Sequence, residues 1–179
     1  MIKKKDLIRN NGTKTFLKNE IKNTEKLINW TPTQKSEYAY LVEAGDYNIP
    51  ALTYGLQRKK IVVAASFKPF TSKTNQGTKA FSYGSLVIPV RNQKSSSDFI
   101  YNTIIDLQKK LKINVSSVKS GLSLKGIDLG SRNIKSLKTP KAAMLIGNGV
   151  RSYEAGEVWH LLDTRVHMPI TKISLNYFD

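Results

Sequence analysis

The feature that most constrains the fold is an alternation of apolar runs and helical patterns that begins near residue 38. Runs at 38–44, 61–67 and 85–90 predict strands, and a 3.6-residue apolar period predicts helices over 47–60 and 98–112. Strands that alternate with helices at this spacing form parallel β-α-β units with right-handed crossovers. The sequence therefore predicts an α/β fold with an open, mostly parallel sheet flanked by helices.

The same analysis assigns the remaining segments. The run IVVAASF at 61–67 is almost continuously apolar, which is typical of a strand buried on both faces. The polar segments 68–85 and 119–140 lack a clear period and predict a long loop and a connection. Ser97 is the expected cap of the second helix. Further strands are predicted at 113–118, 142–147 and 172–177, with a helix starting at Ser152.

Two parts of the chain are predicted to be distinct. Residues 1–30 carry apolar side chains near a helical period, so residues 1–34 are expected to be an N-terminal helical connector. Residues 35–179 are expected to be one α/β domain. We leave open whether residues 141–179 belong to that domain or begin a second, truncated α/β domain.

The amino-acid composition limits the classes of partner that we expect for this chain. The formal net charge of +16 makes nucleic acid the first partner to consider, but only six of the 29 basic residues are arginines. Arginine is the residue that favours base readout and bidentate phosphate binding, so a solvated cationic surface without a specific nucleic-acid partner is the preferred interpretation. The chain has no cysteine, which excludes disulfides and thiol nucleophiles. No apolar run reaches the roughly 20 residues of a membrane span, so none is expected.

The segment 142–175 has the strongest local pattern. Gly147, Asn148 and Gly149 lie between a predicted strand and a helix that Ser152 would cap, the context in which backbone amides can bind phosphate. The third glycine of a dinucleotide fingerprint is absent, because Ser152 occupies its position, and no P-loop lysine follows. These four residues are the only candidates for binding a cofactor, and an ordinary strand-to-helix turn is the favoured interpretation. No cofactor is expected.

Other candidate groups give no catalytic or metal site. His160, Asp163 and His167 lie close together in the sequence, but zinc needs three or four converging ligands, these are the only two histidines of the chain, and no HExxH motif occurs, so no metal site is expected. Ser116 and Lys119 match an SxxK pattern, but their β-branched surroundings do not suit the helix start that this chemistry needs. Trp159 lies on the apolar stripe of its helix and is expected to be part of the core.

Three stretches together resemble a known family. FSYGSLVIPV (81–90), SGLSLKGIDLGS (120–131) and residues 142–175 are similar to the region downstream of the catalytic domain in large bacterial zinc carboxypeptidases. The resemblance covers roughly residues 36–179. It implies α/β segments similar to class I glutamine amidotransferases, with a flavodoxin-like sheet, and a parent protein that is exported. No signal peptide is expected at the start of this chain.

The resemblance also implies what the chain does. The zinc-binding motif and catalytic glutamate of the family would lie in the upstream peptidase domain, and the cysteine of an active amidotransferase is absent here. The chain is therefore expected to be a non-catalytic accessory domain that supports or orients the upstream metallocarboxypeptidase domain. Uncovered strand edges would also promote self-association. The alternative is a small-ligand or nucleotide-binding α/β domain that uses the Gly147–Ser152 turn.

Overall fold

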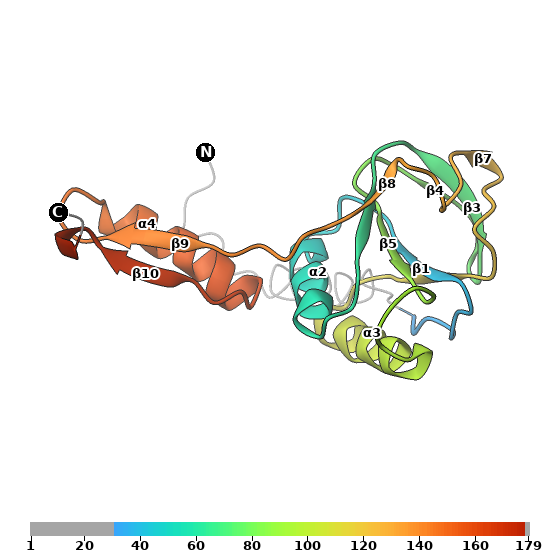
Figure 1. Cartoon of the computed structure of the whole chain (residues 1–179), viewed down its shortest axis with the longest axis horizontal. Coiled ribbons are helices and arrows are strands. Elements are labelled where there is room, and N and C mark those ends of the chain that lie inside the picture. Colours follow the sequence, from blue (N-terminus) through green and yellow to red (C-terminus); the bar gives the residue numbers. More distant parts are fainter. Residues whose placement is uncertain (1–30, 178–179) are drawn as a thin grey trace, which may run out of the picture. The chain divides into compact units, whose positions relative to one another are not determined.

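The computed structural model describes residues 31–177 (Figure 1). The predicted helical connector therefore lies outside the described residues except for residues 31–34, which form neither helix nor strand.

The main sheet is antiparallel, so the predicted open, mostly parallel sheet is wrong. It consists of five strands in the order β6-β1-β5-β2-β8, and every neighbouring pair runs antiparallel. The strands are β1 (Ala39–Val42), β2 (Ala64–Ser66), β5 (Leu86–Pro89), β6 (Ser116–Val118) and β8 (Ile134–Ser136). The central strands β1, β2 and β5 are almost entirely buried. Their continuous apolar runs suggested a parallel sheet, but they arise because both faces of an antiparallel sheet are covered.

Two helices cover one face of this sheet (Figure 1). Helix α2 (Ile49–Arg58) has Pro50 in its first turn, where the missing amide is tolerated, and buries Leu52 and Leu56. Helix α3 (Ser97–Leu111) buries Ile100 and Ile104 against the same cluster. Its N-cap is Ser96 rather than the predicted Ser97, because the Ser96 side chain accepts a hydrogen bond from the Phe99 amide at 3.2 Å.

A second, three-stranded sheet covers the opposite face. Its order is β4-β3-β7, from β3 (Phe70–Thr74), β4 (Gly77–Phe81) and β7 (Lys125–Gly126). The predicted loop over 68–85 is therefore wrong: it contains a tight hairpin. The predicted connection over 119–140 contains β7 and β8. Phe70 and Phe81 stack at 5.0 Å between ring centroids and pack beside Leu41 and Val87 of the main sheet.

Residues 143–177 form a separate two-stranded parallel sheet, shown in orange and red in Figure 1. Strand β9 (Ala143–Ile146) is followed by α4 (Ser152–Trp159), a π-helical turn (His160–Arg165), and the parallel strand β10 (Thr171–Ser174). A 3-10 turn, Leu175–Tyr177, follows. Among the residues that the structure describes, only this unit has the predicted parallel β-α-β arrangement.

Within residues 31–177, none of the helices combines the length and the apolar character that crossing a bilayer requires.

Candidate functional site

The turn at 147–150 has a backbone that requires glycine. The Val150 amide donates to the Gly147 carbonyl at 3.1 Å, and Gly149 has φ of +87°, which is the pattern of a type II turn. Gly147 is also left-handed, with φ of +106°. Ser152 is the first residue of α4 and Arg151 is the N-cap, with no side-chain capping bond, so the predicted Ser152 cap is wrong. The glycines are thus explained by the turn itself.

A cavity of about 330 Å³ lies beside this turn, on the α4 side of the small sheet. Met144 and Ile146 from β9 line it together with Gly147, Ser152 and Trp159. Lys172 of β10 also lines it, and its Nζ lies 5.0 Å from the centroid of the Trp159 ring. A cation at this distance is attracted to the face of the indole. The candidate residues Gly147 and Ser152 therefore border an apolar cavity, whereas Asn148 and Gly149 do not line it.

The charges around the turn do not resemble a phosphate site. Arg151 Nη1 lies 3.3 Å from Glu154 Oε1, so the nearest guanidinium already has a carboxylate partner. Glu154 occupies the first turn of α4, where it interacts favourably with the helix dipole but would repel an anionic ligand. The geometry suits an apolar or aromatic group better than a nucleotide phosphate.

One face of the small sheet is largely exposed. The register pairs Ala143 with Thr171 and Leu145 with Ile173, so these four side chains share the face opposite Met144, Ile146 and Lys172. We call Ala143, Leu145, Thr171 and Ile173 the open sheet face. Leu145 is 45% exposed, and no residue of α4 is buried. Trp159 is 40% exposed, so its predicted place in the core is wrong within the described part of the chain.

The remaining sequence candidates do not converge. Among residues 31–177, no group of three histidine, aspartate or glutamate side chains could hold a metal ion. His160 and Asp163 lie in the π-helical turn, and His167 has a left-handed φ of +57°. Ser116 is a buried residue of strand β6 and not the start of a helix, as the SxxK chemistry would need.

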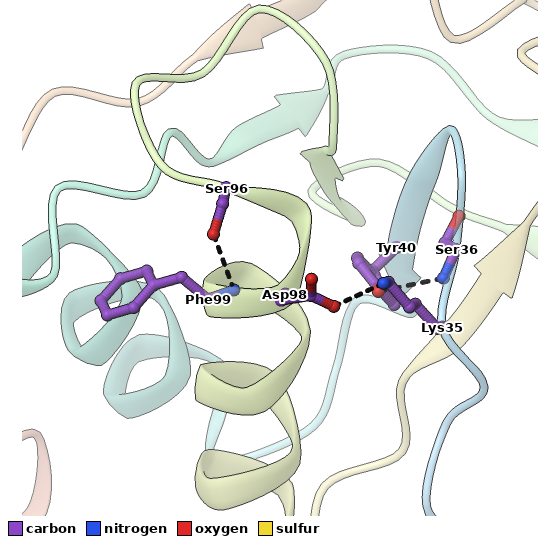
Figure 2. A network of polar contacts seen from close by, with 6 residues as sticks. All are labelled: Lys35, Ser36, Tyr40, Ser96, Asp98 and Phe99. Atoms are coloured by element: carbon purple, nitrogen blue, oxygen red, sulfur yellow. Dashed lines mark hydrogen bonds and ion pairs between the residues drawn. The ribbon is translucent and has the colours of Figure 1, made fainter.

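Sequence reasoning missed a polar network that fixes residues 35–40, where the chain enters strand β1 of the five-stranded sheet (Figure 2). Lys35 forms an ion pair with Asp98 at the start of α3, and the Ser36 amide donates to the Tyr40 hydroxyl at 3.0 Å. The bond to Asp98 raises the pKa of the Lys35 ammonium, and burial raises the pKa of Tyr40. The Ser36 hydroxyl donates to the Val118 carbonyl at 2.6 Å, so this segment ties β6 to β1.

Comparison of the chain with models of protein families, with curated proteins and with solved structures gave no match.

Proposed function

We propose that the chain is a non-catalytic accessory module of a zinc carboxypeptidase-like protein, the family that its sequence resembles. Its role would be to support or orient the metallocarboxypeptidase domain. The observation that carries this proposal is the open sheet face, since a two-stranded sheet with an exposed face is only marginally stable by itself. A surface of this kind marks a place where another protein surface packs.

The charge distribution supports an apolar contact at this unit. Residues 142–177 carry three basic residues (Arg151, Arg165, Lys172) and three acidic ones (Glu154, Glu157, Asp163). Residues 31–141 carry eighteen basic and six acidic residues, so the excess of positive charge lies elsewhere. A partner that covers the open sheet face therefore needs no acidic surface, and its binding would depend on burying apolar area.

The proposal predicts that the zinc carboxypeptidase domain encoded next to this chain binds it, and that Leu145→Glu weakens binding at least tenfold. A buried, unpaired carboxylate would oppose the contact. Isothermal titration calorimetry with the purified domain measures the affinity. Leu124→Glu is the matched control, because Leu124 is also exposed, at 64%, but lies outside the unit.

Three results would contradict the proposal. One is the absence of an encoded peptidase domain beside this chain, and another is equal loss of affinity in the Leu145→Glu and Leu124→Glu variants. The third is one tightly bound zinc ion or peptidase activity in the isolated chain, since the proposal assigns both to the partner domain.

A second candidate function is the binding of a small ligand at the Gly147–Ser152 turn, which the 330 Å³ cavity favours. Ligand pockets commonly have volumes of about 300–1,000 Å³. Because the charges around the turn do not suit a phosphate, this function predicts that a small ligand with an apolar or aromatic group raises the melting temperature. Gly149→Val should remove the shift by straining a residue with φ of +87°. A thermal-shift screen checks it, and Ser152→Ala tests the cavity without straining the turn. The absence of any stabilising ligand in the screen would contradict this second function.

A further inference from the structure

A cavity beside the five-stranded sheet is bounded by three segments. It has a volume of about 450 Å³ and is lined by residues 34–36, by the end of β3 and the turn after it (73–75), and by β6 and the residues that follow (117–122). The three segments are far apart in the sequence, but hydrogen bonds between Ser36 and Val118 and between Asn75 and Ser117 hold them together. Hydrogen bonds from the Ser36 and Asn75 side chains and from the Asn75 amide thus hold the walls together.

The lining is cationic and contains no carboxylate. Lys35, Lys73 and Lys119 all line the cavity, and none of the other lining residues is acidic. Lys35 is already paired with Asp98. Lys73 and Lys119 are exposed and form no ion pair with any residue between 31 and 177. Two ammonium groups are therefore available to a ligand, and lysine binds phosphate well as a point charge.

Asn75 adds a donor whose orientation is fixed. The Asn75 amide donates to the Ser117 carbonyl at 3.0 Å, and its side-chain Oδ1 accepts from the Ser117 amide at 2.8 Å. Because Oδ1 is engaged, the side-chain Nδ2 is left as a donor at a defined position, with no partner among the described residues. Ser117 and Ser120 also line the cavity, and each carries a hydroxyl that can donate.

We propose that this cavity binds a small oxyanionic ligand, a phosphorylated or carboxylated sugar. Two ammonium groups, one amide and two hydroxyls are donors that suit phosphate or carboxylate oxygens beside sugar hydroxyls. The volume suits a ligand of this size. A polymeric nucleic acid would instead need an extended basic groove with stacking aromatics, and no aromatic residue lines this cavity.

The experiment titrates the full chain with glucose 6-phosphate, glucuronate and glucose by calorimetry. Changes in the NMR chemical shifts of the backbone amides locate the binding site. We expect one charged sugar to bind and neutral glucose not to bind, with the largest shifts at Asn75, Ser117 and Lys119. The charged sugar that binds identifies the anion. Lys73→Gln combined with Lys119→Gln should raise Kd at least about tenfold, because each replaces a charge-assisted contact.

Lys94→Gln combined with Lys138→Gln is the matched control, since it removes the same charge from exposed lysines outside the cavity. Little change in this control supports the site. The proposal is overturned if neither charged sugar binds at 10 mM, if both double variants weaken binding equally, or if the shifts map elsewhere. None of these variants changes a residue of the open sheet face. A failure of sugar binding therefore does not bear on the accessory function, and a failure of the accessory function does not bear on sugar binding.

Discussion

Gly126→Ala is expected to lower the free energy of unfolding by about 2–5 kcal/mol. Gly126 has φ of +85°, and a Cβ atom placed there would lie 2.4 Å from the Pro69 carbonyl oxygen and 2.9 Å from Phe70 Cα. The left-handed conformation costs an L-residue about 1–2 kcal/mol. Overpacking against backbone, which cannot rotate away as a side chain can, adds about 1–3 kcal/mol or more.

Gly77→Ala is the matched control for this prediction. Gly77 begins the neighbouring strand β4 with φ of +98°, but nothing lies within 4 Å of a Cβ placed there. Its substitution should cost only the conformational term, about 1–2 kcal/mol. Urea unfolding measures the free energy of unfolding of both variants, and the comparison holds if their m-values are unchanged. If both substitutions lowered the free energy of unfolding equally, the backbone near Pro69 would be able to move away from the added Cβ atom.

The close approach at Gly126 also bears on the proposed sugar site. Strand β7 pairs Gly126 with Phe70 and Lys125 with Thr71, which fixes the segment that carries Ser120 and Leu122 into the cavity wall. A Gly126→Ala chain that still folds should therefore bind the charged sugar more weakly, whereas Gly77→Ala should not change binding. The stability and binding measurements thus test the same contact.

The sequence predicted the main elements where local pattern and burial agree. Helix α2 and strands β1, β5 and β9 fall within their predicted ranges, and α3 begins one residue before its predicted start, because each has a continuous apolar run or a clear helical period. Their partners were not predictable in the same way. A run such as 61–67 is compatible with either strand direction when both faces are covered, and strand direction depends on contacts far along the chain.

The β3–β4 hairpin was missed because polar residues occupy buried positions. Phe70, Ser72 and Thr74 alternate inward, and two of the three are hydroxyl residues that a hydrophobic pattern does not register. Thr74 is satisfied locally by donating to the Gly77 carbonyl at 2.8 Å. The signal that could have located the hairpin is Asn75-Gln76-Gly77, a turn sequence flanked by β-branched and aromatic residues.

The candidate sites also differ in whether a local sequence signal reveals them. The Gly147–Ser152 turn was recognised from its residues, since glycines between a strand and a helix are a local signal. The lysine-lined cavity was not recognised, because it joins residues 34–36, 73–75 and 117–122 through hydrogen bonds between distant segments. None of these segments has an unusual composition, so only the fold brings their donors together.

Gln108→Leu is expected to lower the free energy of unfolding by about 3 kcal/mol, although leucine is apolar and similar in size. Gln108 is fully buried on α3. Its Oε1 accepts from the Thr33 amide at 3.1 Å, and its Nε2 donates to the Ile113 carbonyl at 3.1 Å. Leucine would leave both main-chain groups buried without partners, and each such group costs about 1–3 kcal/mol.

Gln57→Leu makes this prediction specific to the hydrogen bonds. Gln57 is also buried on a helix, but among residues 31–177 its Oε1 has no partner, and its Nε2 donates to the Leu137 carbonyl at 3.1 Å. Removing an unsatisfied oxygen offsets the loss of that bond, so the expected change is within about 1 kcal/mol. Urea unfolding of the two variants compares their free energies of unfolding directly.

Because Gln108 anchors Thr33, its variant should also speed amide exchange at Thr33, a change that Gln57→Leu should not produce. Equal destabilisation with unchanged exchange at Thr33 would mean that the fold does not depend on the Gln108 bonds.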